Sequence, residues 1–302
     1  MSTSTEAGPR LVAPPRSGGP AGAGQRRSRA TARRAGVATQ LLLWGYAVVA
    51  LLPLVLVVLN SLRPSREIFN DPLGLPHSLD LTSYGRAWQE ASFATYFRNS
   101  LLVTIGAVLL GTAVSVLAAY PLGRYTFRGS GVLAAYFLSG LMLPIRLGIL
   151  PIFYLLASMH LVDSLTGLVL VYAASGVPFS TFVLIGFFRQ LPADLEEAAR
   201  IDGAGDFRTF FKVMLPLVRP AVATVIVFQF VPLWNDFIFP LVLLRSTDKA
   251  TIPVGLTVFF GEFQTDWSTL SAGLVLATLP LLALFLVATK QIVTGLTAGM
   301  SK

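Results

Sequence analysis

Cysteine is absent from the sequence, and histidine occurs only at His77 and His160. The absence of cysteine excludes disulfide bonds, thiolate metal sites and cysteine nucleophiles. The two histidines are far apart in the sequence, so we expect no histidine-rich metal site. A membrane-embedded enzyme would need clustered carboxylates or histidines, or a nucleophile beside its base, and the sequence shows no such cluster. We therefore expect neither a metal centre nor a catalytic centre.

Charged residues are also scarce, at 13% of the 302 residues, whereas hydrophobic residues reach 54%. Soluble domains carry about 25% charged residues, so this composition indicates a membrane protein. None of the lysines, which are Lys212, Lys249, Lys290 and Lys302, follows a glycine. That excludes the Gly-Lys-Ser/Thr loop that cradles phosphates in ATPases. If ATP drives this protein, the energy must arrive through contact with another protein.

Long apolar runs predict six membrane-spanning helices, because a span needs about 20 apolar residues. The predicted spans are residues 36–59, 100–122, 131–156, 165–188, 218–243 and 271–292. Prolines inside these runs imply kinks, which membrane helices tolerate when neighbouring groups satisfy the freed carbonyls. The fold class predicted from the sequence is therefore an all-α membrane protein with six transmembrane helices.

The distribution of basic residues predicts how these helices are oriented. With the N-terminus in the cytoplasm, sixteen of the 23 Lys and Arg residues fall on the inner side. Both termini and the polar segment 189–219 are then cytoplasmic, in a multi-pass protein of the cell membrane. The net charge of +8 is explained by this asymmetry, so we expect the lipid bilayer, and no nucleic acid, as the partner of the basic side chains.

Residues 1–36 form a separate segment, which is rich in Gly, Pro, Ala and Ser and contains seven arginines but one acid, Glu6. The segment lacks apolar periodicity, so we predict a disordered basic arm on the cytoplasmic side. A solvated arm beside anionic lipid headgroups is the simplest interpretation. Residues 37–302 then form the six-helix domain.

The segment 189–219 lies between two apolar runs and has the pattern of two helices with a break. Pro192 suits a first helical turn, and the acids Asp194, Glu196 and Glu197 suit the positive end of the helix dipole. Gly203 permits the backbone to leave helical geometry. Asp206 is predicted to cap the second helix. That helix would carry Phe207, Phe210, Phe211 and Met214 at helical spacing, until Pro216 disfavours helix at the preceding residue.

This segment resembles the cytoplasmic EAA loop of ABC importer permeases. The resemblance rests on Glu197-Ala198-Ala199, on Gly203 and on Leu215-Pro216 at the family's spacing; Val213 stands where the family has Ile. Further short matches, such as Ile201-Asp202-Gly203-Ala204 and Trp234-Asn235-Asp236-Phe237, resemble the maltose-type (MalG-like) subfamily of carbohydrate permeases. The resemblance covers much of the chain from Leu41 to Lys302.

The resemblance implies the type I importer (MetI-like) transmembrane fold and a sugar as cargo. It implies a second homologous permease subunit, a dimer of cytoplasmic ABC ATPases and an extracytoplasmic sugar-binding protein. ATP and Mg²⁺ would be used by the ATPase, and this chain would bind no cofactor. The residues implied in coupling to the ATPase are Glu196, Glu197, Ala198, Ala199, Asp202, Gly203, Val213, Leu215 and Pro216.

Arg146 and Asp236 are the charged residues inside predicted spans that need an explanation, because a charge at mid-bilayer costs about 3 kcal/mol. They are expected to pair with each other, to snorkel, or to line a cavity. Trp234, Asn235 and Asp236 offer the aromatic and hydrogen-bonding groups that bind sugars. A structural role at the helix bend near Pro232 is an equal alternative.

Other functions stay open from the sequence alone. An ion-driven secondary transporter would favour several intramembrane ionisable residues in a relay, and only about two are present. A permease of the same family for a polyol, a phosphoglycerol or a peptide is also compatible with the EAA loop. Only the resemblance to the carbohydrate subfamily favours a sugar or oligosaccharide.

Overall fold

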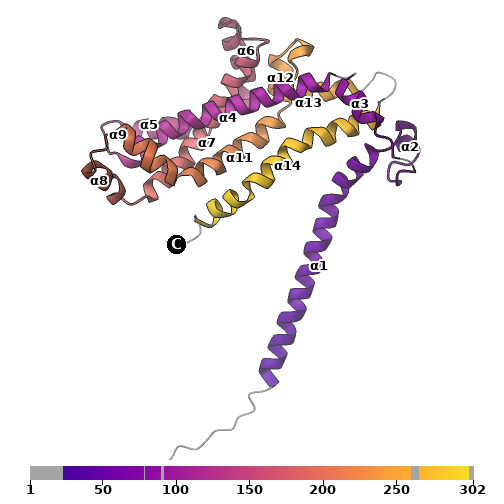
Figure 1. Ribbon diagram of the computed structural model, residues 1–302, viewed down its shortest axis with the longest axis horizontal. Coiled ribbons are helices and arrows are strands. Elements are labelled where there is room, and N and C mark those ends of the chain that lie inside the picture. Colours follow the sequence, from indigo (N-terminus) through magenta and orange to yellow (C-terminus); the bar gives the residue numbers. More distant parts are fainter. Residues whose placement is uncertain (1–22, 78, 90–91, 260–264, 299–302) are drawn as a thin grey trace, which may run out of the picture. The chain divides into compact units, whose positions relative to one another are not determined.

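The computed structural model describes residues 23–77, 79–89, 92–259 and 265–298, and the elements of regular structure in these ranges are all helices (Figure 1). This confirms the predicted all-α class. The chain divides into two compact units, Met1–Val55 and Leu56–Lys302. Four helices are long and apolar enough to cross a membrane, and a bent helix pair provides a fifth candidate among the described residues.

The first unit contains most of α1 (Ala23–Asn60), whose stretch Thr39–Asn60 is apolar enough to span a bilayer. Its large apolar side chains, such as Leu42 and Trp44, are exposed within the unit, as expected for a surface that lipid covers. The predicted disordered arm differs from the structure over residues 23–36, which are helical. Ala and Arg favour helix, and extending an existing helix needs no new nucleus. Residues 1–22 of the arm lie outside the described residues.

The second unit is built on α4 (Phe93–Arg124), α7 (Leu165–Gln190), α11 (Arg219–Trp234) and α14 (Trp267–Ala298). Helix α4 packs against both α7 and α11, and α11 packs against α14 (Figure 1). The approach of α4 to α7 depends on a small residue, Gly111, because a Cβ there would lie 2.9 Å from the carbonyl oxygen of Ala173. Small residues at such crossings let membrane helices pack closely.

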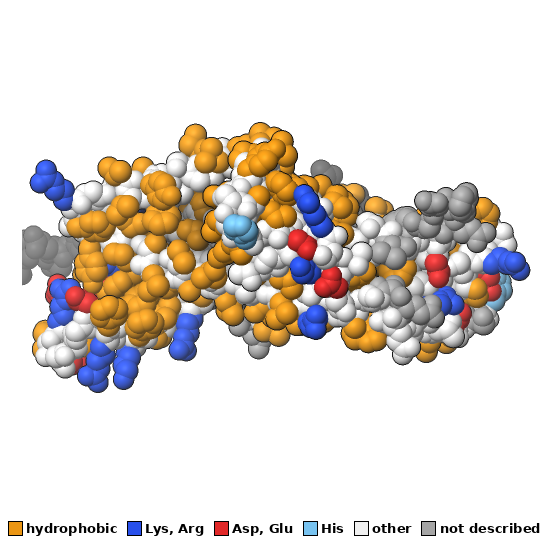
Figure 2. All heavy atoms as spheres, turned by 90° about the horizontal axis from the view of Figure 1, so that it is seen from above, with side chains coloured by type: hydrophobic (Ala, Val, Ile, Leu, Met, Phe, Trp, Pro, Cys, Tyr) orange, Lys and Arg blue, Asp and Glu red, His pale blue; other side chains and the backbone are white. Residues whose placement is uncertain are grey.

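The opposite side of α4 carries leucines, with Leu102, Leu109 and Leu117 more than half exposed. Figure 2 shows hydrophobic side chains over the flank of this unit, while Lys and Arg gather at the end that carries α8 (Asp194–Ile201) and α9 (Asp206–Thr209). An apolar flank beside a basic end is the pattern that a bilayer with an adjoining aqueous side requires.

The third predicted span, residues 131–156, is not one continuous helix. It consists of α5 (Ser130–Ser139), the 3₁₀ helix η1 (Ile145–Gly148) and α6 (Ile149–Ser158). Pro144 has extended backbone geometry, and a proline also disfavours helix at the residue before it. The fifth predicted span, residues 218–243, is likewise interrupted, because α11 ends at Trp234 and α12 (Ile238–Leu243) begins after a short break.

Short helices fill the two long polar segments between the spans. They are α2 (Ser65–Asn70), α3 (Thr82–Gln89), η3 (Thr247–Lys249), α13 (Ile252–Gly255) and η4 (Leu256–Phe259). Helix α3 packs against α14 and α4, and α13 packs against α4. Figure 1 places α3 and α13 at the end of the unit opposite α8 and α9. The unit therefore has two structured ends, which the long helices join.

Asp163 joins the loop before α7 to the loop after α12. Its carboxylate accepts hydrogen bonds from the Ser246 hydroxyl, from the Ser246 backbone N–H at 3.0 Å and from the Arg245 backbone N–H at 2.9 Å. The Lys249 ammonium lies 3.0 Å from the same carboxylate. The Ser246 hydroxyl and backbone hydrogen bonds hold the pKa of Asp163 well below its usual range. The charged carboxylate therefore fixes the loop before α7 to the loop after α12.

Candidate functional site

Helix α8 ends in a turn that requires glycine. The Gly203 N–H donates to the Arg200 carbonyl at 3.0 Å, and the Ala204 N–H donates to the Ala199 carbonyl at 2.9 Å. This pair of bonds is a Schellman motif, in which the residue after the helix adopts a left-handed conformation. Gly203 has φ of +77°, which confirms that the backbone leaves helical geometry at this position.

The second helix of the 189–219 segment starts differently from the prediction. Gly205 occupies the N-cap position, and Asp206 is already the first residue of α9. The predicted side-chain cap by Asp206 is therefore wrong, because its carboxylate lies one residue too far along to cap the helix. The carboxylate instead lies 3.6 Å from the exposed Arg200 guanidinium, an ion pair that crosses the turn at Gly203.

The predicted aromatic stripe is divided between two surfaces. Phe210 and Met214 are buried, whereas Phe207 is 83% and Phe211 is 55% exposed. Residues four apart share a face here and residues three apart do not, and a π-helix over Phe210–Met214 interrupts the regular helical spacing that the stripe assumed. The chain continues as α10 (Leu215–Leu217), so Leu215 is helical despite Pro216. The bend of 70° comes before α11.

The 189–219 segment also divides into an outer and an inner face. Glu197, Ala198 and Asp202 are exposed, as is Ile201 at 86%. By contrast the Glu196 side chain is only 11% exposed. Ala199 is buried, and Val213, Leu215 and Pro216 are half-buried. Residues that the sequence presents as one motif thus face in opposite directions.

Glu196 points inward because Arg124 and Tyr120 of α4 bind it. The Arg124 Nη2 lies 3.0 Å from one carboxylate oxygen, and the Tyr120 hydroxyl donates to the other at 3.0 Å. Tyr125 joins the cluster through a hydroxyl contact of 2.8 Å with Tyr120. A buried carboxylate needs such partners, because an unpaired one would be strongly disfavoured. Sequence reasoning did not identify this network.

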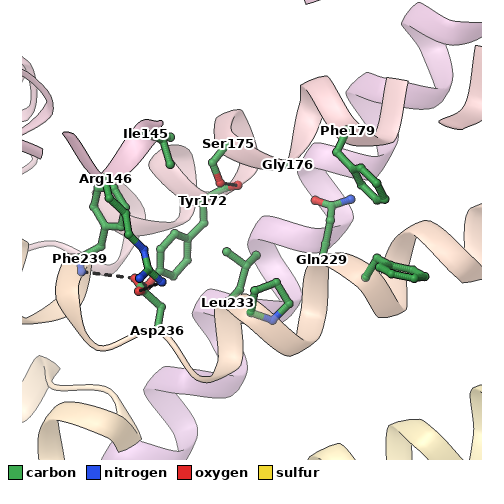
Figure 3. A pocket seen from close by; sticks show the side chains of 12 residues that line it. Ile145, Arg146, Tyr172, Ser175, Gly176, Phe179, Gln229, Leu233, Asp236 and Phe239 are labelled. Atoms are coloured by element: carbon green, nitrogen blue, oxygen red, sulfur yellow. Dashed lines mark hydrogen bonds and ion pairs between the residues drawn. The ribbon is translucent and has the colours of Figure 1, made fainter. Parts of the chain in front are cut away.

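A cavity of about 300 Å³ opens between α7 and α11; we call it the α7–α11 cavity (Figure 3). It is lined by Ile145, Arg146, Tyr172, Ser175, Gly176, Phe179, Phe228, Gln229, Pro232, Leu233, Asp236 and Phe239. Aromatic faces make up much of this lining, and the polar groups come from η1, α7, α11 and the break before α12. A mostly apolar cavity with a few directed polar groups is typical of a small-molecule site.

Arg146 and Asp236 lie together at one end of this cavity (Figure 3). Their closest charged atoms, Arg146 Nη2 and Asp236 Oδ1, are 3.5 Å apart. The other Asp236 oxygen accepts hydrogen bonds from the Tyr172 hydroxyl at 2.7 Å and from the Phe239 backbone N–H at 3.3 Å. Asp236 is therefore buried and satisfied, and it holds the start of α12 to α7. Arg146 is 70% exposed, so most of its donors face open space.

Trp234 and Asn235 do not line the α7–α11 cavity. The Trp234 ring stacks on Phe230, and its Nε1 donates to the Ala277 carbonyl at 3.0 Å. The Asn235 amide donates to the Val231 carbonyl at 2.8 Å. Successive helical residues point about 100° apart, so neighbours of Asp236 in the sequence reach other surfaces. Two of the four predicted pathway residues are thus brought together at the cavity.

Two groups of lining residues were missed in the sequence. Tyr172, Ser175, Gly176 and Phe179 fall at i, i+3, i+4 and i+7 of α7, a spacing that signals one helix face. Gln229 is a buried amide in an apolar helix, and such polar residues mark functional or packing positions. Its Nε2 donates to the Ser180 hydroxyl at 2.8 Å and to the Thr112 hydroxyl at 3.2 Å. The described residues contain no group of three His, Asp or Glu side chains arranged to hold a metal ion.

Residues 111–298 match the family model described as "Binding-protein-dependent transport system inner membrane component". The diacetylchitobiose uptake system permease protein NgcG of Streptomyces coelicolor is 36% identical over 261 residues, which are 86% of each chain. The arabinooligosaccharides transport system permease protein AraQ of Halalkalibacterium halodurans is 35% identical, over 84% of this chain and 91% of that protein.

A solved structure is similar as well. It is a chain of a bacterial ABC transporter involved in the import of the acidic polysaccharide alginate, with a TM-score of 0.78 and 25% sequence identity. The match covers 86% of this chain and 97% of that chain. The arrangement of α4, α7, α11 and α14 therefore has a counterpart among importer structures.

Proposed function

The chain belongs to the family of binding-protein-dependent transport system inner membrane components, and we propose that it is one of two permease subunits in an ATP-driven importer of a sugar or oligosaccharide. It is a transport subunit of an ABC importer and not an enzyme. Membership of this family implies in general a partner permease, an ATPase and a substrate-binding protein. The identities of these partners and the cargo are the parts that we propose.

The observation that carries the proposal is the exposed outer face of the 189–219 segment. Ile201 and Phe207 are 86% and 83% exposed on a short, capped and internally anchored structure. Large apolar side chains on a polar loop are typical of protein interfaces rather than of free surfaces. We infer that one subunit of a cytoplasmic ABC ATPase dimer covers this face and contacts Glu197, Ala198 and Asp202.

Such a contact would supply the energy that this chain cannot obtain itself. ATP and Mg²⁺ would be bound and used by the ATPase, since this sequence has no phosphate-binding loop. Closure of the ATPase dimer would move α8 and its Schellman turn as a rigid unit. The attached long helices would then exchange between inward-open and outward-open arrangements, which is a shift between two populations driven through an interface.

The α7–α11 cavity is the part of this chain that we assign to the cargo pathway. A sugar presents hydroxyl groups and apolar ring faces, and the cavity offers aromatic rings, Ser175, Gln229 and the Arg146–Asp236 pair. The paired charges cancel, which suits an uncharged polyol better than a phosphoglycerol. The names of the two relatives, which refer to diacetylchitobiose and to arabinooligosaccharides, support a saccharide.

The protein lies in the cell membrane as a multi-pass protein, as its family and its apolar helices indicate. We propose that both termini face the cytoplasm, because the basic residues concentrate on that side under the positive-inside rule. The end with α8 and α9 would then meet the ATPase. The end with α3 and α13 would meet a sugar-binding protein that delivers the cargo.

Uptake into proteoliposomes tests this proposal directly. The affinity-tagged chain would be purified from its own membrane with its bound partners, and then reconstituted with ATP inside or outside the vesicles. We expect an ATPase to copurify, and labelled diacetylchitobiose or arabinooligosaccharide to accumulate only when ATP faces the ATPase. Uptake that persists without ATP and stops when a proton gradient is collapsed would instead establish an ion-driven transporter.

A further inference from the structure

The geometry points to Arg124 and Glu196 as a strut that transmits movement of α8 to α4, and so connects the ATPase-facing end of this chain with its cavity. The inference rests on the proposed function, because it specifies how a pull on the 189–219 segment would reach the membrane helices. Arg124 and Glu196 are positioning residues here, since neither touches the cargo or the ATPase.

All five N–H donors of the Arg124 guanidinium are used. Nε and Nη2 donate to Glu196 Oε2 at 3.2 and 3.0 Å. Nη1 donates to the carbonyls of Phe188 and Leu191 at 3.2 and 2.6 Å, and Nη2 also donates to the Pro192 carbonyl at 3.3 Å. A planar guanidinium has five donors in a fixed fork, whereas a lysine has three on one nitrogen.

These contacts join three elements at one point. Phe188 belongs to the last turn of α7, Leu191 and Pro192 form the connection, and Glu196 belongs to α8. Arg124 itself is the last residue of α4. A displacement of α8 therefore acts on α4 directly through a side-chain contact, besides acting on α7 along the backbone.

The contact with α4 is made on both sides of Pro121. Tyr120 precedes this proline and binds one oxygen of Glu196, while Arg124 follows it and binds the other. Proline removes one helical hydrogen bond and weakens the helix at that point. The Glu196 carboxylate therefore binds the last turns of α4 at two points, and α4 is one continuous helix from Phe93 to Arg124, which can transmit a displacement along its length.

Helix α4 leads from this contact to the cavity. Thr112 lies twelve residues before Arg124, a distance of about 18 Å at the helical rise. The Thr112 hydroxyl accepts a hydrogen bond from the Gln229 amide at 3.2 Å, and Gln229 lines the α7–α11 cavity. The Arg124–Glu196 strut, helix α4 and the hydrogen bond from Gln229 to Thr112 form a continuous path of contacts from α8 to the cavity.

The burial of the pair suits this role. The side chains of Arg124 and Glu196 are 8% and 11% exposed, so water screens their attraction weakly. Arg128, four residues further along, is exposed and provides a matched control on the same end of the chain. Its substitution changes a basic residue just beyond the end of α4 without removing any of the contacts described above.

The test uses the absence of cysteine in this chain. A Ser175→Cys reporter places one thiol in the cavity, and its rate of labelling by a maleimide dye is measured in nanodiscs that hold the complex with its copurified ATPase. The probe is the non-hydrolysable nucleotide AMP-PNP with Mg²⁺. We expect the nucleotide to change the labelling rate about fivefold or more, the lower range of coupling between sites. Arg124→Lys and Glu196→Gln should abolish this change while the ATPase still copurifies, and Arg128→Lys should retain it.

A normal nucleotide response in Arg124→Lys and Glu196→Gln would overturn the inference. Loss of the ATPase from these variants would also overturn it, because the network would then serve only to fold the docking face. If Arg124→Lys fails to accumulate, Tyr120→Phe, which removes one hydroxyl contact, decides by the same readout. A partial loss of the nucleotide response in Tyr120→Phe supports the strut, and a normal nucleotide response in this variant rejects it. Failure of the parent complex to bind an ATPase or to respond to nucleotide would refute the proposed function itself.

Discussion

Gly203→Pro should separate membrane assembly from transport. Proline fixes φ near −65°, whereas Gly203 has φ of +77°, and proline also lacks the N–H that Gly203 donates to Arg200. The helix-ending turn therefore cannot form with proline, and the change costs about 3 kcal/mol or more locally. No Cβ contact lies within 4 Å of Gly203, so the effect is one of backbone geometry and not of crowding.

The matched control is Gly205, two residues further along. Its φ is −72°, and a Cβ there also meets nothing within 4 Å, so Gly205→Ala adds neither backbone strain nor a clash and should cost less than about 1 kcal/mol, the preference for glycine over alanine at an N-cap. Gly203→Ala keeps the N–H donor but places an L-residue in the left-handed region, which costs about 1–2 kcal/mol. That is roughly a 5- to 30-fold fall in the equilibrium constant for forming the native turn. We therefore expect a graded loss of coupling across the three variants.

The assay compares ATP-dependent uptake with ATP hydrolysis in the same proteoliposomes. We expect Gly203→Pro to reach the membrane at the parent level, because the turn lies outside the packed helices. Uptake per ATP hydrolysed should fall strongly for Gly203→Pro, moderately for Gly203→Ala and least for Gly205→Ala. Normal uptake by Gly203→Pro would refute the argument that this turn must keep its geometry for coupling.

The remaining predictions concern stability in detergent, measured by thermal unfolding. Arg146→Ala should destabilise the protein more than Asp236→Asn does. The first substitution leaves the buried Asp236 carboxylate without its counter-ion, whereas an amide at position 236 keeps an oxygen acceptor. Equal losses of thermal stability in the two variants would contradict this asymmetry. Asp163→Asn should lower stability at pH 7, because the native contacts favour the charged carboxylate and lower its pKa. The deficit should begin to shrink as the pH falls below about 4, the unfolded-state pKa, and should disappear only as the pH falls through the lower pKa of the folded state. A deficit independent of pH would exclude the carboxylate as its cause. Gly111→Ala should lower the free energy of unfolding by about 1–3 kcal/mol through overpacking, because the added Cβ would lie 2.9 Å from a backbone oxygen. Gly106→Ala is the control and should be tolerated, because its Cβ would lie 3.5 Å from the nearest side chain.

The features that the sequence predicts well are those set by local chemistry. Gly203 ends α8 as expected, because a left-handed residue after a helix is a local requirement that few residues satisfy. The spans that became α4, α7 and α14 were found because about 20 apolar residues suffice to identify them. The third span is predicted as continuous because its composition is largely apolar, although Pro144 marks the break.

The direction in which Glu196 faces depends on a distant residue. Glu196 and Glu197 are adjacent acids near the start of the same helix, and no local rule decides which of them is buried. Arg124 decides it, and this arginine lies 72 residues earlier in the chain. The sequence motif therefore locates the 189–219 segment but does not divide it into an outer and an inner face.

The cavity residues illustrate the same limit. Asp236 and Arg146 stand out because charge inside an apolar run is conspicuous, and of the alternatives that the sequence leaves open the structure shows an ion pair at 3.5 Å at the edge of the cavity. Trp234 and Asn235 were grouped with Asp236 by position in the sequence, although α11 ends between them and turns their side chains elsewhere. Helical spacing along α7 would have been a better guide than sequence adjacency.

The charge balance of the cavity also bears on the source of energy. A proton-driven transporter needs a carboxylate that gains and loses a proton during the cycle. Asp236 instead accepts hydrogen bonds from Tyr172 and the Phe239 backbone and faces the Arg146 guanidinium. These contacts fix the helix break and pair the two charges beside the cavity, which agrees with the proposal that the force that opens the cavity is delivered from outside it, through the 189–219 segment.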